Sequence, residues 1–267
     1  MITDKIGIGI VTCDRPDFYH NCITSILETH KHIDVQDIVV VNDSKRNQVL
    51  STSPHGCNVI NNGKNLGVGR SKNKLLQYLM GNECEHIFLV EDDVVFNSNQ
   101  VVNQYIELSQ KSGVKHLNFC LHGEDNKFNG EPKPKLIVDY GDIKMSLYHN
   151  VYGALSYYHS SVIEEIGMMD IRYYNAMEHV DHTMETIKAG YHPPFRWFAD
   201  VHNSDVLISE QDHGHSDSKI RASDDWSKNF QQAVGLFYNK HAVNVCDPNQ
   251  ETASKDDAVN FLKCVKP

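Results

Sequence analysis

The stretch Phe88-Leu-Val-Glu-Asp-Asp-Val94 decides the fold of this chain. It belongs to an expected strand that starts at His86 and runs directly into three consecutive acidic residues, Glu91 to Asp93. A short apolar run rich in β-branched and aromatic residues is typical of a strand buried on both faces of a parallel sheet. In such sheets, ligands bind at the carboxyl ends of the strands, so the three acidic residues are the first candidate site residues.

Three further strands are expected upstream of this stretch. They cover Lys5 to Thr12, Asp37 to Asp43 and Cys57 to Ile60. The spacing of apolar residues predicts one helix that begins at Pro16 and another over Gly67 to Met80. Strands that alternate with helices at such short intervals predict an α/β fold, in which helices flank a mainly parallel central sheet.

The second half of the chain has a looser pattern. We expect a strand over 114–119 and a hairpin whose strands cover 135–138 and 143–148. The predicted helices of this half cover 99–112, 160–167, 178–190, 224–240 and 253–263. The last two are amphipathic and predict a helical C-terminal tail.

The composition is that of a soluble globular protein. Among 267 residues, 25 lysines and arginines face 35 aspartates and glutamates, which gives a net charge of −10. This balance argues against a protein that holds nucleic acid mainly by neutralising phosphates, because such binding needs a cationic face. No apolar run reaches the roughly 18 residues that span a bilayer. The seven cysteines form no Cys-x-x-Cys pair and the start lacks a signal-peptide pattern, so we expect a cytoplasmic protein with free thiols.

Polar segments follow each of the four strands expected in the first half of the chain. They are Thr12-Cys-Asp-Arg-Pro16, Asn42-Asp-Ser44, Asn62-Gly-Lys-Asn-Leu-Gly67 and Glu91-Asp-Asp93. A carboxylate at a strand end accepts hydrogen bonds from a base N–H or a ribose hydroxyl. Paired carboxylates hold a hard divalent cation whose other ligands are phosphate oxygens. Together these strand ends predict a nucleoside-diphosphate site with a metal ion.

Four segments resemble the nucleotide-binding half of a family 2-type glycosyltransferase with the GT-A fold. They are Ile10-Val-Thr-Cys-Asp-Arg-Pro16, Val39-Val-Val-Asn-Asp-Ser44, Asn65-Leu-Gly-Val-Gly-Arg-Ser-Lys-Asn73 and Phe88-Leu-Val-Glu-Asp-Asp-Val94. The last is similar to the family's Asp-x-Asp metal motif, in a Glu-Asp-Asp form. Cys13 and Asp14 depart from the family's Tyr and Asn, so the contacts to the base are expected to differ in detail.

The resemblance implies a metal cofactor, Mn²⁺ or Mg²⁺, at the Glu-Asp-Asp motif. Asp93 would be the direct ligand, while Glu91 and Asp92 would hold ribose, sugar hydroxyls or metal-bound water. The metal would act as a Lewis acid on the leaving diphosphate.

The resemblance also implies a nucleotide-sugar donor, by preference a UDP-sugar. Asp14 and Asp43 would contact the nucleoside, and Lys72 would lie near the pyrophosphate. The remaining expected donor contacts are Thr12, Arg15 and Asn65.

The segment Tyr174-Asn-Ala-Met-Glu-His-Val-Asp-His182 resembles the family's Glu-Asp-x-Asp segment, whose carboxylate deprotonates the acceptor hydroxyl in inverting members. We favour Asp181 as this base, then Glu178, then His179, which aligns with the usual base. A base needs only hydrogen-bond reach of the hydroxyl and a suitable pKa. Asn175 to Glu178 also fits a helix capping box. If the enzyme retains configuration, the segment would only position the acceptor.

A further metal ligand is expected from the loop Gln211-Asp-His-Gly-His-Ser216, because GT-A enzymes often use a C-terminal histidine. His215 is our first choice, then His213, with His202 as another possibility. Lys219 and Arg221 would meet the diphosphate when this loop closes.

The sequence therefore predicts a metal-dependent glycosyltransferase that moves a hexose or pentose to an acceptor hydroxyl of a glycan or a lipid-linked precursor. One alternative is a phage-type enzyme that glycosylates hydroxymethylcytosine in DNA, with a basic groove formed by Lys219, Arg221 and Lys228, or by Lys127, Lys133 and Lys135. Another is a non-catalytic nucleotide-sugar-binding module. We expect a catalytic domain over 1–222, with a donor half over 1–119 and an acceptor half over 120–222, and a helical extension over 223–267.

Overall fold

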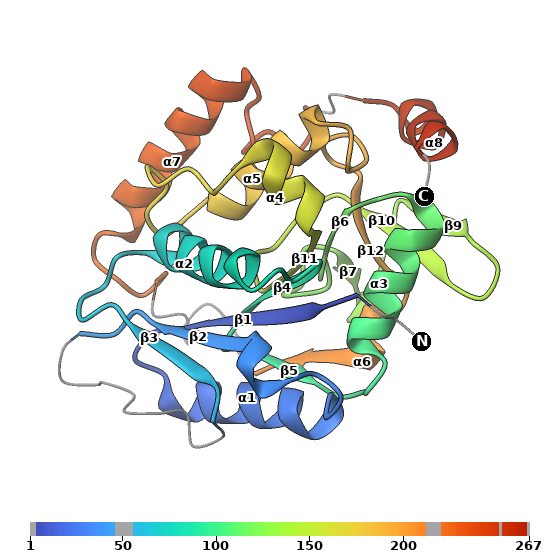
Figure 1. Ribbon diagram of the computed structural model, residues 1–267. Helices are drawn as coiled ribbons and strands as arrows, with labels where there is room; N and C mark the ends of the chain where they lie inside the picture. The colour runs from blue at the N-terminus through green and yellow to red at the C-terminus, as the bar shows by residue number, and fades with distance from the viewer. Residues whose placement is uncertain (1–3, 46–55, 212–219, 251–252, 266–267) are drawn as a thin grey trace.

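The centre of the molecule is a six-stranded sheet with the strand order β3-β2-β1-β4-β11-β6 (Figure 1). The computed structural model describes residues 4–45, 56–211, 220–250 and 253–265. Strands β1 to β4 run parallel, and β11 is antiparallel to both β4 and β6. The mainly parallel α/β sheet that the sequence predicted is confirmed. The six strands are β1 (Ile6–Thr12), β2 (Ile38–Asn42), β3 (Asn58–Asn61), β4 (His86–Glu91), β6 (His116–Asn118) and β11 (Leu155–His159).

Helices cover both faces of this sheet, and alternate residues of each strand point to opposite layers. Ile8 and Phe88 pack with α1 (Pro16–Thr29) and α3 (Val101–Ser112). Val39 and Leu89 pack with α2 (Val68–Gly81) and α4 (Ser160–Ile166) on the other face. Burial on both faces explains why the strands are continuously apolar in sequence.

Two glycines of β1 let α2 lie directly on the sheet. A Cβ atom at Gly9 would lie 2.8 Å from the Cβ of Leu75, and one at Gly7 would lie 2.7 Å from a methyl carbon of Leu79. Side chains at these positions would push the helix away. The Gly7-Ile-Gly9 pattern therefore serves close packing of a helix against a strand.

Strand β11 is the central element that the sequence did not predict. It follows the loop after Tyr148 and inserts between β4 and β6, where Tyr157 and Tyr158 are fully buried. The motif-bearing strand β4 therefore lies inside the sheet, with β1 on one side and β11 on the other.

The second half adds smaller sheets beside the central one. The predicted hairpin is present as β9 (Leu136–Asp139) and β10 (Lys144–Tyr148), and β12 (Phe198–Val201) joins β10. Strand β5 (Val94–Phe96), directly after the acidic motif, pairs with β13 (Ile208–Glu210). The remaining short elements are η1 (Val35–Asp37), β7 (Lys127–Phe128), β8 (Glu131–Pro132) and α6 (Ser204–Leu207).

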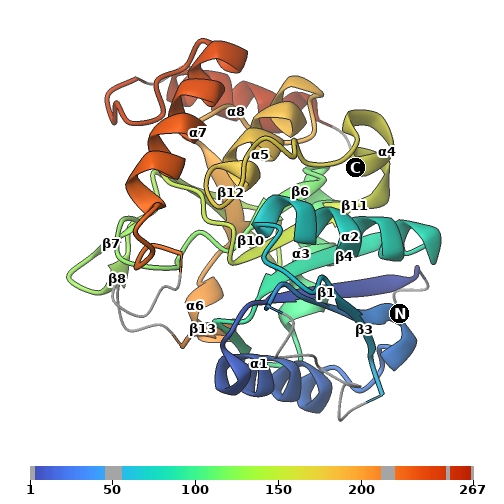
Figure 2. The same cartoon turned by 90° about the vertical axis from the view of Figure 1, so that its left-hand side faces the viewer.

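Three helices lie in the C-terminal part of the chain, one before residue 222 and two after it. The helix α5 (Glu178–Lys188) lies on the same side of the sheet as α2, and α7 (Trp226–His241) runs beside it (Figure 2). The C-terminal helix is α8 (Lys255–Cys264). Within the described part of the chain, no helix is long and apolar enough to cross a membrane.

Candidate active site

Two cavities open at the carboxyl edge of the sheet and meet at the acidic motif. The first, which we call the N-terminal cavity, has a volume of about 460 Å³ and is lined mainly by the ends of β1, β2 and β4. The second, the C-terminal cavity, has a volume of about 400 Å³ and is lined mainly by residues after 120. Glu91 and Asp93 line both cavities.

The N-terminal cavity collects almost all the residues predicted for donor binding. Side chains from three different strand ends and from the loop before α2 line it together. These residues are Thr12, Asp14, Arg15, Asp43, Asn65, Glu91 and Asp92.

The acidic motif is fixed by the segment that follows β1. Thr12 Oγ1 donates to Asp92 Oδ2 over 2.6 Å, and the guanidinium of Arg15 bonds to Asp92 Oδ1. Arg15 also lies 3.4 Å from Asp93 Oδ2. Both oxygens of Asp92 thus have protein partners, which leaves Asp93 as the less satisfied carboxylate.

Asp93 has the properties of a cation ligand. Its side chain is buried, and its Oδ1 atom has no hydrogen-bond partner among the described residues. Burial raises the pKa of Asp93, and neighbouring Glu91 adds to this, while His122 and Arg15 act in the opposite direction. Burial likewise raises the pKa of Asp92 to about 7. Desolvated neighbouring carboxylates are costly, and a divalent cation would relieve that cost. The residues present therefore fit Mn²⁺ or Mg²⁺.

Asp43 holds the loop that leads into α2. Its carboxylate accepts from the backbone N–H groups of Leu66 and Gly67, over 2.7 and 2.9 Å, and from the Asn62 amide over 2.7 Å. Asn65, at the tip of this loop, accepts from Tyr174 Oη over 3.0 Å. Asp43 thus shapes the cavity wall through its loop contacts.

Lys72, which the resemblance placed near the pyrophosphate, is buried between the end of β4 and the start of α5. It lines neither cavity, and its side chain is 2% exposed. Its ammonium nitrogen lies 2.7 Å from Glu91 Oε1, 3.3 Å from Glu178 Oε1 and 3.0 Å from the carbonyl oxygen of Gly153. Lys72 therefore joins the end of β4 to the start of α5, and its positive charge is paired with the carboxylates of Glu91 and Glu178.

The start of α5 brings two of the three predicted bases to the C-terminal cavity. Glu178 and His179 line it, and His179 Nδ1 lies 3.3 Å from Glu178 Oε1. Burial alone would raise the pKa of Glu178, but the charges of Lys72 and His179 outweigh it and the net shift is downward. The N-cap of this helix is Met177, so Glu178 is its first residue and not the third residue of a capping box that starts at Asn175.

The loop before β11 passes close to the charged groups of Lys72, His179 and Glu91. A Cβ at Gly153 would lie 2.9 Å from both Lys72 Nζ and His179 Nδ1, and 3.1 Å from Glu91 Oε1. Only glycine leaves room for the backbone to close over the charged groups.

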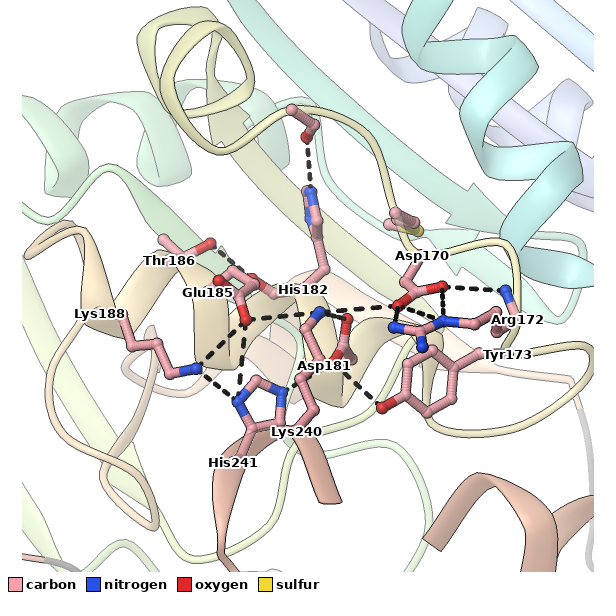
Figure 3. Close-up of polar contacts among 12 residues, drawn as sticks. Asp170, Arg172, Tyr173, Asp181, His182, Glu185, Thr186, Lys188, Lys240 and His241 are labelled. Atoms are coloured by element: carbon pink, nitrogen blue, oxygen red, sulfur yellow. Dashed lines mark hydrogen bonds and ion pairs between the residues drawn. The ribbon is translucent and has the colours of Figure 1, made fainter. Parts of the chain in front are cut away.

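Asp181, the base that the sequence favoured, lines neither cavity. It is 1% exposed and turns from α5 toward α7 (Figure 3). Its oxygens accept from Lys240 Nζ over 2.8 Å, His241 Nε2 over 2.7 Å and Tyr173 Oη over 3.1 Å. The one-turn spacing between Glu178 and Asp181 could not reveal which of the two faces the cavity, because that depends on where α7 packs.

The expected histidine ligands cannot all be placed. His213, His215 and Lys219 lie outside the described residues. Gln211, which precedes them, donates its backbone N–H to the Asp93 carbonyl over 2.7 Å, so the chain leaves the described part beside the acidic motif. His202 bonds to Ser146 over 2.9 Å and lines neither cavity.

Some site residues were missed by the sequence analysis. His122 lines the C-terminal cavity, with its Nδ1 atom 3.2 Å from Glu210 Oε2. His122 follows β6, whose carboxyl end lies at the same edge of the sheet as that of β4. A position after a predicted strand was the sequence feature that could have identified it. The aromatic lining of the cavity gave no local signal, because it comes from separate segments. It consists of Tyr152, Phe195, Phe198, Trp226 and Phe230.

The residues suggested for a basic groove have other contacts. Lys127 lies 3.4 Å from Glu210 Oε1, and Lys135 lies over the Trp197 ring, 3.8 Å from its centroid. Lys133 lies 5.4 Å from the centroid of Phe128. Arg221 lines the C-terminal cavity. These contacts give no support to a DNA acceptor.

Comparison with known proteins adds one family match. Residues 8–167 match the model of glycosyl transferase family 2. A sequence search of the curated proteins returned no match.

Solved structures with a similar fold are glycosyltransferases at low sequence identity. A Pyrobaculum calidifontis mannosyltransferase, PcManGT, in complex with GDP-Man and Mn²⁺ has 12% identity and a TM-score of 0.54, over 97% of this chain and 68% of that one. S. aureus TarS 1-349 has 11% identity and a TM-score of 0.52, over 98% and 81%. A further structure of S. aureus TarS has 16% identity and a TM-score of 0.49, over 68% of this chain and 33% of that one. The present chain thus spans about a third of that TarS chain.

Proposed function

The chain belongs to glycosyl transferase family 2 and has its GT-A fold, and we propose that it transfers a sugar from a nucleoside-diphosphate donor in the N-terminal cavity to a carbohydrate hydroxyl in the C-terminal cavity. The observation that carries this proposal is that the two cavities meet at Glu91 and Asp93. A donor sugar at that junction has its anomeric carbon open to an acceptor on the other side.

The N-terminal cavity suits a nucleoside diphosphate. Asp14 and Asn65 are exposed on its wall and offer acceptors and donors to a base and a ribose. Mn²⁺ or Mg²⁺ bound at Asp93 would supply Lewis acidity toward the leaving diphosphate. His213 and His215 remain our candidates for additional ligands. A UDP-sugar is the preferred donor, and GDP-sugars are the first alternative to test.

The general base is best assigned to His179, with Glu178 as its positioning residue. A carboxylate kept charged by Lys72 can only accept, so the hydrogen bond requires the proton to be on His179 Nδ1. The lone pair of Nε2 then remains available to an acceptor hydroxyl. Glu178 is itself a poor base, because its pKa is lowered.

With His179 as the base, we propose a direct displacement. The acceptor hydroxyl gives its proton to His179 Nε2 as its oxygen bonds to the anomeric carbon. The bond from that carbon to the diphosphate oxygen breaks, and the electron pair leaves with the diphosphate. A single displacement inverts the anomeric configuration.

The decisive experiment measures release of nucleoside diphosphate from a panel of UDP- and GDP-sugars, with Mn²⁺ or Mg²⁺ and a mixture of oligosaccharides. We expect metal-dependent turnover by the wild type and none by Asp93→Ala. The anomeric configuration of the product, read by NMR, tests the displacement. A folded protein that turns over none of these donors would contradict the proposal, and equal turnover by the variant would contradict the site.

A further inference from the structure

The helix α7 carries one continuous inner face with three different environments along it. The face consists of Trp226, Phe230, Ala233, Phe237 and the pair Lys240 and His241, which recur at intervals of three and four residues. Its first part lines the C-terminal cavity, its middle is buried in the core, and its end contacts α5.

The cavity part of this face is a pair of aromatic rings. Trp226 and Phe230 are one helical turn apart, both line the C-terminal cavity, and their ring centroids lie 5.4 Å apart with an interplanar angle of 34°. Neither ring is fully buried. Two such rings offer an apolar surface to the C–H face of a sugar ring, while the amide of Asn175 in the same cavity offers polar contacts.

This surface belongs to a different element from the reacting groups. The bond-making end of the cavity is formed by β4 and the start of α5, through Glu91, Asp93 and His179, whereas the ring pair belongs to α7. A cavity of about 400 Å³ also has room for more than one sugar ring. A ring pair on a different element in the same cavity suits a sugar unit other than the one that reacts.

The far end of α7 is anchored to α5 by a cluster of ion pairs around the buried side chain of Asp181 (Figure 3). Asp181 is the centre of this anchor, because Lys240 and His241 both donate to it. Glu185 joins through Lys240, over 3.4 Å, and Lys188 lies 3.3 Å from the same Glu185 oxygen. His241 has a fully buried side chain and stacks against Phe237, with centroids 4.5 Å apart.

The anchor is an ion-pair network and makes no metal site. Ligand atoms of Asp181, Glu185 and His241 lie within 4.8 Å of one another, a spacing that a cation could bridge. Two lysine ammonium groups already supply the positive charge there, so a metal ion would have to displace them.

We propose that Trp226 and Phe230 form a stacking platform for the second sugar unit of an oligosaccharide acceptor, and that Asp181 is the positioning residue that holds this platform through Lys240 and His241. The proposal rests on the proposed function, since it names the acceptor class of the same cavity.

The first test uses a glycan array that displays one to four sugar units, probed with labelled protein in the presence of UDP and MnCl₂. The wild type is expected to bind glycans of two or more units, and Trp226→Ala to lose this binding, while Trp226→Phe keeps it. Three results would overturn the platform. They are binding of Trp226→Ala to the array as strong as that of the wild type, wild-type binding to single sugars as strong as to longer glycans, and no binding by the wild type.

The second test measures transfer kinetics on the glycan that binds best. Trp226→Ala and Phe230→Ala are expected to raise the acceptor KM about tenfold, with a much smaller change in kcat and an unchanged nucleotide affinity. Asp181→Asn should also raise the acceptor KM with a much smaller change in kcat, because it weakens the contacts with Lys240 and His241 that hold α7. If Asp181 were the base, kcat would instead fall by about 10²- to 10⁴-fold. That result would overturn the positioning role.

Two further variants keep the test informative. Lys240→Met removes the more exposed partner of the anchor and should also raise the acceptor KM, even if Asp181→Asn fails to fold. Tyr238→Ala is the matched control, since Tyr238 lies on the outer face of α7 and is 55% exposed. Turnover of the donor distinguishes failure of the proposed function from failure of the platform proposal. No turnover contradicts the proposed function, whereas turnover with a wild-type acceptor KM in Trp226→Ala and Lys240→Met contradicts only this inference.

Discussion

The ammonium of Lys72 lies 2.7 Å from the carboxylate of Glu91, and this buried ion pair joins α2 to the end of β4. The same ammonium reaches Glu178 at the start of α5. One lysine thus links the strand that carries the acidic motif with the helix that carries the proposed base. The geometry of the junction between the two cavities depends on it.

Removal of this lysine should be costly. In Lys72→Met, Glu91 and Glu178 lose their buried partner, and loss of one member of a buried ion pair costs about 3–5 kcal/mol of unfolding free energy. Urea unfolding at pH 7 measures this loss. Glu178→Gln combined with Lys72→Met should recover part of it, because one unpaired charge is then absent. A single variant as stable as the wild type would contradict the role of Lys72.

The pH dependence of stability should weaken in the same variant. In the wild type the pKa of Glu178 is lowered from its ordinary 4.5, with Lys72 as the largest favourable charge, so its contribution is present above pH 4.5 and is lost as the pH falls. Without Lys72 the pKa is lowered less, so less stability should be lost as the pH falls from about 7 to about 3. Melting temperatures of the variant and the wild type across this range test the difference, and equal losses would contradict it.

Asp93→Ala should strongly reduce transfer without destabilising the fold. Loss of a metal-binding carboxylate is expected to cost at least about 10²-fold in kcat. Because burial and Glu91 raise the pKa of Asp93, its removal relieves an unfavourable charge, and the melting temperature should stay the same or rise. A thermal shift with MnCl₂, present in the wild type and absent in the variant, would report the lost ion. An equal Mn²⁺ shift in both proteins would argue against this ligand.

His179→Gln should lower kcat by about 10²- to 10⁴-fold with little change in either KM, as expected for loss of a general base. Glu178→Gln should have a smaller effect on kcat, because the imidazole of His179 is still present and only the carboxylate that orients it is lost. In His179→Ala, added imidazole should restore part of the rate. A variant with wild-type kcat would rule out His179 as the base.

Gly9→Ala should destabilise the fold through packing. Its Cβ would lie 2.8 Å from the Cβ of Leu75, and overpacking of a core typically costs about 1–3 kcal/mol. Gly81→Ala is the matched control, because Gly81 ends α2 with open space around the position of its Cβ, and it should be neutral or slightly stabilising. Chemical unfolding of both variants compares them. Equal stability of the two would contradict the packing role of Gly9.

Much of the donor half could be predicted from local patterns. Continuous apolar runs identified β1, β2 and β4, and the polar residues that follow them converge because parallel strands end at one edge. Strand β11 escaped prediction because its sequence, with Ser156 and two tyrosines, looks half polar, yet hydrogen bonds to neighbours let it lie inside the sheet. The contacts of Lys72 with Glu91 and Glu178 could not be predicted, because sequence cannot show which way a helical side chain points.

The sequence by itself determined the α/β fold, the family and the acidic motif at the end of β4, because these depend on short-range periodicity and on order along the chain. Only the tertiary structure decided which groups on α5 face the cavity. Glu178 and Asp181 are three residues apart on one helix, and each is surrounded by charges from distant segments. The packing of α7 against α5 draws Asp181 away from the cavity and adds Trp226 and Phe230 to its wall. Contacts between elements so far apart in sequence have no local pattern.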